Sequence, residues 1–232
     1  LQLWREGRPT AIEPQLRTAK YLLSLGRTTA ALARIADAAA IDHEHSELFP
    51  LHLTIARRHN ENSRQDGENL LKQCLQSSRQ LPDARDPISF VLCAEAALTQ
   101  ADPSNAQVSQ RMAQIALACA RHAIRSFPRA DIPRQYELQA LLLLKQYEEA
   151  ARTATLTISA IDPQPTTLSL AIEAKKLAGE PLRDLLRIAI PRLRQNPQMQ
   201  LELLRLALED APSTSDRFVS DALIAKGAPV AA

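Results

Sequence analysis

Apolar residues recur along most of the chain with the spacing of an α-helix. In residues 181–195 they fall at Leu182, Leu185, Leu186 and Ile190, which together make one helical face. Prolines interrupt the pattern at intervals of 32 to 46 residues, and proline is well tolerated in the first turn of a helix. The pattern therefore predicts a succession of helix pairs, each closed by a short turn.

The positions of these prolines and turns predict six helix pairs. The predicted helices are 12–25 with 28–40, 48–60 with 67–81, 87–100 with 103–126, 131–144 with 147–160, 165–178 with 181–195, and 197–210 with 213–226. One pair cannot bury its apolar face alone, so we expect the pairs to stack into one continuous domain over residues 1–232. The chain begins at Leu1 without Met, and we expect it to be a piece of a longer protein.

Composition excludes several classes of protein. Among 232 residues there are 5 Gly and 3% aromatic residues, too few for a β-sandwich or barrel. No apolar run reaches the roughly 18–20 residues that a membrane span needs. With 28 basic and 26 acidic residues, the net charge of +2 is too small to make nucleic acid the main partner. The expected partner is a protein or peptide.

Two segments resemble the tetratricopeptide repeat, a helix–turn–helix family with a repeat of about 34 residues. In Leu22–Asp42, Gly26 matches the family's turn and Ala31 its small residue on the second helix. In residues 141–163, Tyr147, Glu149 and Ala150 match the start of the family's second helix. The resemblance covers about 60–70 residues and implies an all-α, right-handed solenoid of about six antiparallel helix pairs.

The same resemblance implies function. Such arrays are non-enzymatic scaffolds that hold a peptide or helix in a concave groove lined by the first helices of each pair. If Gly26 occupies the family's turn position, the groove-facing residues of the first pair are Leu16, Arg17, Lys20, Leu23 and Ser24. The corresponding residues of the fourth and fifth pairs are Gln135, Tyr136, Gln139, Ser169 and Glu173. A cationic end and a polar middle suit an extended segment with an acidic or carboxyl-terminal end.

Several residues carry groups that can bind metals or catalyse reactions. His43, Glu44, His45 and Glu47 crowd a predicted loop, but a closed metal site draws four ligands from separated elements, so we expect a solvated loop. Cys119 and His122 share a helical face without a second pair of ligands. No phosphate-binding glycine loop or nucleophile motif is present. We therefore expect no catalytic residue, no metal and no cofactor.

The three cysteines, Cys74, Cys93 and Cys119, are odd in number and far apart in sequence, which argues against a disulfide framework. Cys93 and Cys119 are interpreted as small buried apolar residues. Free thiols favour a reducing, cytoplasmic compartment, and a periplasmic location stays open. The Arg-rich composition fits the base bias of a bacterial genome.

Two alternative functions stay open. The array can be a structural spacer within a larger protein, or an RNA-binding helical repeat that uses its local arginine clusters. The apolar beginning of the chain, with Leu1, Leu3 and Trp4, is expected to pack on the first pair or on a second copy, which makes a homo-oligomer a further expectation.

Overall fold

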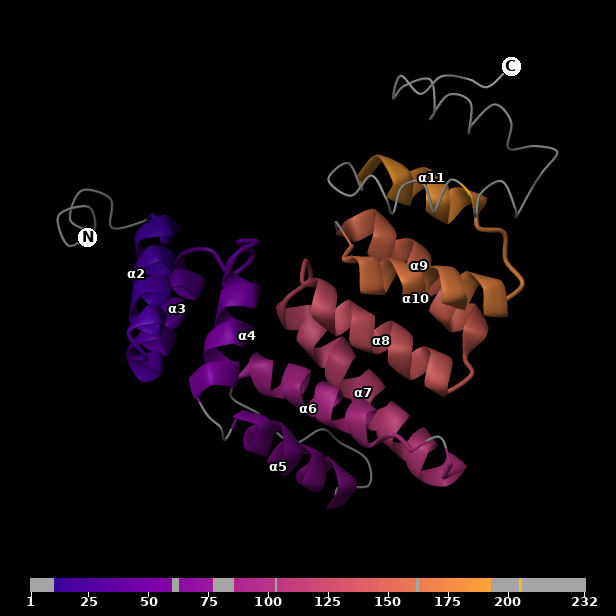
Figure 1. The fold of residues 1–232 in the computed structure, drawn as a ribbon, viewed down its shortest axis with the longest axis horizontal. Coiled ribbons are helices and arrows are strands. Elements are labelled where there is room, and N and C mark those ends of the chain that lie inside the picture. The colour runs from indigo at the N-terminus through magenta and orange to yellow at the C-terminus, as the bar shows by residue number, and fades with distance from the viewer. Residues whose placement is uncertain are drawn as a thin grey trace. The chain divides into compact units, whose positions relative to one another are not determined.

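A computed structural model describes residues 11–59, 63–76, 86–102, 104–161, 163–192 and 205, and every regular element among them is an α-helix (Figure 1). The helices are α2 (Ile12–Ser24), α3 (Thr28–Ile41), α4 (Leu48–His59), α5 (Ser63–Gln76), α6 (Pro87–Gln100), α7 (Ala106–Ser126), α8 (Asp131–Leu143), α9 (Tyr147–Ala160), α10 (Pro165–Leu177) and α11 (Arg183–Arg192). The prediction of an all-α fold is confirmed. None of these helices is long and apolar enough to cross a membrane.

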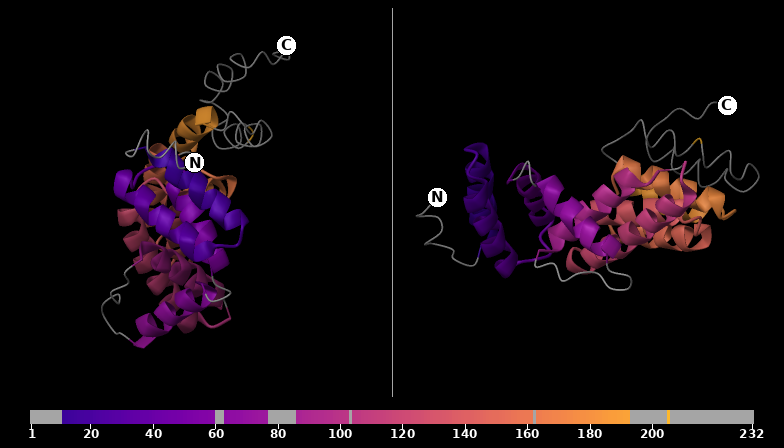
Figure 2. Two further views of the ribbon diagram at one scale, coloured as in Figure 1. Left: turned by 90° about the vertical axis from the view of Figure 1, so that its left-hand side faces the viewer. Right: turned by 90° about the horizontal axis from the view of Figure 1, so that it is seen from below.

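The helices form two compact units, residues 1–144 and residues 145–232, and each is described by itself. In the first unit α2 packs on α3, α5 on α6, and α7 on both α6 and α8. Figure 2 shows this succession from the indigo α2 to α8. In the second unit α9 packs on α10 and α11. A single domain over residues 1–232 stays a prediction.

The first helices of successive pairs also contact one another. These are α2, α4, α6 and α8, and each touches the next in that order. Contact between equivalent helices of neighbouring pairs is typical of a stacked helical repeat, because each pair buries the apolar face that its neighbour exposes. Residues 11–144 therefore form a helical-repeat array.

Most helix bounds agree with the sequence prediction. The spans 87–100 and 147–160 are reproduced, and α2, α3, α4, α8 and α10 differ by one residue at one end. The sixth predicted pair, 197–226, lies outside the described residues, as do Leu1, Leu3 and Trp4.

Gly67 is a correction to the predicted bounds. We expected a break there and a helix over 67–81, but α5 runs from Ser63 to Gln76 and contains Gly67. Gly67 is buried against α6, where an added Cβ would lie 2.7 Å from the Leu92 carbonyl oxygen. The glycine allows α5 and α6 to approach closely. In the sequence alone, a glycine at such a position indicates a turn.

Capping residues decide where two helices begin. The Asp86 carboxylate accepts a hydrogen bond from the Ile88 N–H at 3.0 Å, with Pro87 in the first turn, as the sequence predicts. α7 begins at Ala106 rather than 103, because Asn105 supplies the cap and accepts from the Val108 N–H at 3.2 Å.

Three of the predicted turns contain a residue with left-handed backbone. Gly26 and Gly179 have φ of +72° and +68°, and each follows the last turn of its helix. After Gly26, the Arg27 N–H donates to the Leu22 carbonyl at 2.9 Å, which satisfies a free carbonyl at the helix end. Lys145 takes the same conformation with φ of +57° between α8 and α9.

Alanine is the most frequent buried apolar residue in the described part of the chain. Ala31 and Ala150, the two small residues of the repeat resemblance, are fully buried. In the first unit one apolar cluster gathers Leu16, Ile35 and Ile55 between α2, α3 and α4. A second gathers side chains of α4 to α8 around Phe90 and Cys93. Close helix crossings of this kind need short residues at the point of contact.

Candidate functional site

The predicted cationic end of the groove lies on α2. Arg17 and Lys20 are both exposed, as expected for residues that face a partner. Lys20 Nζ lies 2.7 Å from Glu47 Oε2, however, with both side chains more than half exposed. The hydrogen bond from Lys20 lowers the pKa of Glu47. Lys20 is thus charge-balanced by the segment that leads into α4.

The other three residues predicted to face the groove in the first pair are Leu16, Leu23 and Ser24. Leu16 is 2% exposed and belongs to the core between α2, α3 and α4, so the expectation that it faces a groove is wrong. It follows Ile12 by one helical turn, and both turn toward α3. Leu23 is half-buried against the same cluster. The Ser24 hydroxyl is exposed and donates to the Tyr21 carbonyl at 2.7 Å.

Tyr136 joins a polar cluster that links three first helices. Arg57 on α4 lies 2.9 Å from Glu95 on α6, and the Tyr136 hydroxyl on α8 hydrogen-bonds to both. The tyrosine is 8% exposed, so its ring is part of the core and only its hydroxyl reaches the pair. Burial, aided by the Glu95 carboxylate, raises the pKa of Tyr136 to about 12. Burial acts to lower the pKa of Arg57, but the bond to Glu95 raises it overall.

No sequence motif links Arg57 with Glu95. Each lies in the third turn of a first helix, and the two helices belong to successive pairs. The sequence feature that could have indicated this pair is the presence of opposite charges at similar positions in neighbouring repeats. His52 on α4 makes a further contact of this type, since its Nε2 lies 3.4 Å from Asp86 Oδ2 at the start of α6.

These contacts make up three groups of side chains, which we together call the first-helix polar row. It consists of Lys20, Glu47, His52, Asp86, Arg57, Glu95 and Tyr136. Each pair in the row joins one first helix to the next, or to the segment just before it. The row therefore crosses from α2 to α8 without using the second helices α3, α5 or α7.

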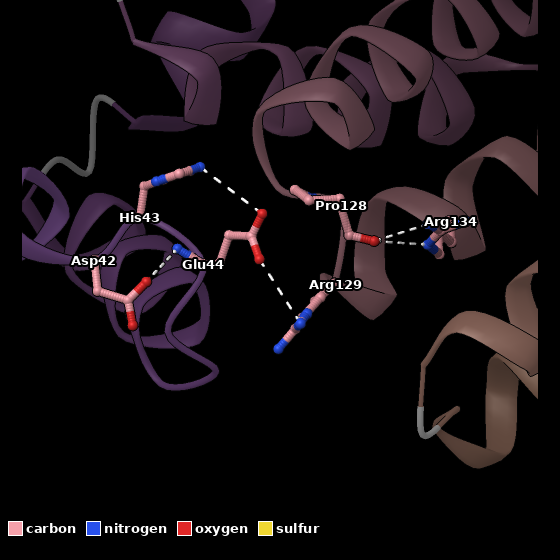
Figure 3. A network of polar contacts seen from close by, with 6 residues as sticks. All are labelled: Asp42, His43, Glu44, Pro128, Arg129 and Arg134. Carbon is pink, nitrogen blue, oxygen red and sulfur yellow. Dashed lines mark hydrogen bonds and ion pairs between the residues drawn. The ribbon is translucent and has the colours of Figure 1, made fainter.

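The loop with the histidines is occupied by ion pairs, as Figure 3 shows. Glu44 lies between His43, at 4.0 Å, and Arg129, at 3.8 Å. Its backbone N–H donates to Asp42 Oδ1 at 3.0 Å. Arg134 donates twice to the Pro128 carbonyl beside Arg129. The loop before α4 thus contacts the loop before α8 through Glu44 and Arg129, while the Asp42 carboxylate accepts from the backbone of its own loop.

The remaining predicted site residues are divided between the two units. Gln135 and Gln139 are half-buried on α8. Ser169 and Glu173 are exposed on α10 in residues 145–232, and the Ser169 hydroxyl donates to the Pro165 carbonyl of its own helix. A common groove for all of these residues stays a prediction.

A shallow hollow lies at the start of α9. It is lined by Lys145, Gln146, Tyr147, Glu148, Glu149 and Arg152. Glu148 and Glu149 are the adjacent acids of this hollow, one exposed and one half-buried, with Lys145 and Arg152 beside them.

The cysteines lie together, which the sequence did not show. Cys74 on α5, Cys93 on α6 and Cys119 on α7 are buried, and their sulfur atoms all lie within 4.8 Å of one another. Burial of Cys93 and Cys119 is confirmed. Hydrogen bonds from Cys119 and Cys93 lower the pKa of Cys74, while the bond to Cys74 and burial raise that of Cys119. This is the only such group of potential metal ligands in the part of the chain that the structure describes.

No family model and no curated protein sequence matches the chain. Among solved structures, a thermophilic TPR protein of Thermus thermophilus is similar over 92% of this chain and 100% of its own, with 19% identity and a TM-score of 0.41. The description of this chain as an array of helix pairs rests on the contacts between its own helices.

Proposed function

We propose that the chain is a non-enzymatic scaffold that binds a peptide or a protein helix along the first helices α2, α4, α6 and α8. The observation that carries this proposal is their contact in unbroken order, which makes one surface from four separate segments. Helical-repeat arrays use such a surface to recognise extended partners through side-chain anchors and charge.

The first-helix polar row suits a partner with a carboxylate. Lys20 and Glu47 are 52% and 56% exposed, and an exposed ion pair of this kind contributes only about 0–1 kcal/mol. A partner carboxylate can therefore replace Glu47 at small cost and also reach Arg17, one turn away on the same helix. Gln135 and Gln139 on α8 supply hydrogen-bonding groups further along. The preferred ligand is an extended segment with an acidic or carboxyl-terminal end.

A displayed peptide library with free carboxyl termini tests this proposal. The recovered peptides are expected to be enriched in acidic residues near the terminus, and amidation of the terminus is expected to weaken binding. In a fluorescence anisotropy titration, the double variant Arg17→Glu with Lys20→Glu should lose most of the affinity.

The matched control reverses the same number of charges on second helices. Lys72 on α5 and Arg125 on α7 are exposed, so Lys72→Glu with Arg125→Glu changes net charge equally. Equal loss of affinity in both double variants would indicate bulk charge rather than a site on α2. Unchanged affinity in the α2 variant would place the site elsewhere.

The alternatives make different predictions. A structural spacer recovers no peptide from the library. An RNA-binding repeat is retained on a polyanion resin in a salt-dependent manner. The polar row disfavours this second alternative, because acidic side chains pair with Lys20 and Arg57.

A further inference from the structure

We propose that Cys74, Cys93 and Cys119 form a three-coordinate binding site for a trivalent thiophilic ion, of which arsenite is the representative. The site lies in the first unit and is independent of the first-helix polar row. It departs from the sequence-based expectation of no metal site, because that expectation treated each cysteine separately.

The geometry fits three sulfur ligands on one ion. α5, α6 and α7 each contribute one thiol, and α6 packs directly on both α5 and α7. With thiolate bonds of about 2.3 Å, as in zinc sites, and the angles of roughly 100° of a pyramidal trivalent ion, two sulfurs lie about 3.5 Å apart. The three sulfurs already lie within 4.8 Å of one another, so only small side-chain movements are needed.

The number of ligands disfavours zinc. Structural zinc sites are four-coordinate, and no imidazole nitrogen or carboxylate oxygen of the described residues joins the three sulfurs. His122, three residues after Cys119, stacks on Phe90 with ring centroids 4.0 Å apart. Three soft thiolates without a fourth ligand suit an ion that prefers sulfur and accepts three bonds.

The surroundings select the charge of the ion. Cys93 and Cys119 have no exposed surface and Cys74 is 7% exposed, and all three lie in the apolar cluster with Leu71, Val91 and Ala116. An uncompensated charge is costly there. Three thiolates balance a trivalent ion, whereas a divalent or monovalent ion leaves net negative charge in the core.

The binding step balances without an oxidant. Arsenous acid, As(OH)₃, exchanges its three hydroxyl groups for the three sulfurs. Three As–S bonds form and three As–O bonds break, and each thiol proton leaves with one hydroxide as water. Arsenic stays trivalent, the reagent and the product are both neutral, and the ion enters past Cys74, the least buried of the three thiols.

The test uses the chain reduced with a phosphine, because dithiol reductants chelate arsenite. The chain has no other cysteine, so any thiol adduct reports this cluster. Native mass spectrometry with sodium arsenite is expected to show a one-to-one adduct that has lost three hydrogens. The adduct should raise the melting temperature and protect all three cysteines from alkylation together.

Two variants separate ligand loss from core damage. Cys93→Ala removes one ligand and is expected to lose the adduct, whereas Val91→Ala truncates the same core, keeps all thiols and should retain it. Cys74→Ala, at the least buried position, repeats the ligand test if Cys93→Ala does not fold. No adduct on the reduced natural chain, or equal affinity in a folded cysteine variant, would overturn the proposal. Tighter binding of Zn²⁺ or Cu⁺ than of arsenite would overturn the trivalent assignment.

Discussion

Alanine at a helix crossing determines how closely two helices approach. Ala31 on α3 is fully buried, whereas its neighbour Ala30 is exposed. Replacing Ala31 with Leu forces three extra carbons into a packed site and is expected to lower the free energy of unfolding by about 1–3 kcal/mol. Ala30→Leu, the same change one residue earlier, should stay within about 0.5 kcal/mol. Urea denaturation compares the two, and equal losses would show that the helical phase of α3 is wrong.

Thr157 on α9 carries a buried hydroxyl without a partner. The residue has no exposed surface, and its Oγ1 makes no hydrogen bond to any described residue. Val has nearly the same shape and lacks the hydroxyl, so Thr157→Val is expected to raise the free energy of unfolding by about 1 kcal/mol.

The control for this change is Thr155 on the same helix, whose hydroxyl donates to the Ala151 carbonyl at 3.2 Å. Thr155→Val removes a made hydrogen bond and should not stabilise the chain. Thermal melting compares the stability of the two variants. A higher melting temperature for Thr155→Val with an unchanged one for Thr157→Val would contradict the assignment of the Thr157 hydroxyl as the unpaired group.

At the scale of the element, the Asp86 cap makes the start of α6 sensitive to pH. Burial acts to raise the pKa of Asp86, but the hydrogen bond and charge of His52 and the bond from Ile88 hold it below the usual value. The pKa of an Asp carboxyl in the unfolded chain is about 4. Because the pKa of Asp86 is lower in the folded chain, ionised Asp86 stabilises the fold at pH values above about 4. This stabilisation is lost as the pH falls through the folded-state pKa.

Asp86→Ala is therefore expected to cost about 1 kcal/mol at pH 7, the usual value of an N-cap. The gap between the variant and the natural chain should narrow as the pH falls from 5 to about 2, because protonation weakens the natural cap. Urea denaturation across this range measures the gap. A gap that stays constant or widens in acid would exclude the ionised Asp86 carboxylate as its source.

Gly67 gives a prediction with an unusual sign. In an exposed helix interior, Gly→Ala stabilises by about 1 kcal/mol. Here the added Cβ would lie 2.7 Å from the Leu92 carbonyl oxygen and 2.8 Å from its carbon, both backbone atoms that cannot rotate away. Gly67→Ala is expected to destabilise the chain, while Asn69→Ala on the exposed face of α5 should not. A stabilised Gly67→Ala in calorimetry would show that α5 and α6 lie further apart.

Helix positions were largely predictable because proline, caps and apolar spacing are local. Asp86, Pro87 and the run of apolar residues that follows them specify where α6 lies without reference to its neighbours. The turn predicted at Gly67 is wrong because glycine is needed there for close contact with Leu92 of α6, 25 residues further along the chain. A local sequence pattern does not contain this contact. The start of α7 was misplaced because Asp102–Pro103 and Asn105 are competing caps of similar strength.

The candidate sites were less predictable than the helices, since they depend on which helix faces meet. Arg17 and Lys20 were recognised as exposed cations, but the partner of Lys20, Glu47, lies beyond an intervening helix. Cys74, Cys93 and Cys119 are spread over forty-six residues and share no motif spacing. They come together because α5, α6 and α7 present one thiol each to the same core, a property of packing rather than of any segment.

At the scale of the whole molecule, we propose that the first helices together provide the binding surface. In the described part of residues 1–144, the second helices α3, α5 and α7 do not contribute to the first-helix polar row. A partner that binds along the row should contact α2 and α4 together, because Lys20 of α2 pairs with Glu47, the residue just before α4. A partner that contacts only one helix pair would not need the stacked first helices.

Hydrogen-exchange mass spectrometry with and without the peptide recovered from the display library tests this claim most directly. Bound peptide is expected to slow exchange in α2, α4 and the segment between Asp42 and Glu47, with α3, α5 and α7 unchanged. The double variant Arg17→Glu with Lys20→Glu should abolish the slowing in α2. Protection confined to the second helices, or slowing in α2 that persists in this variant at the same peptide concentration, would contradict a binding surface on the first helices.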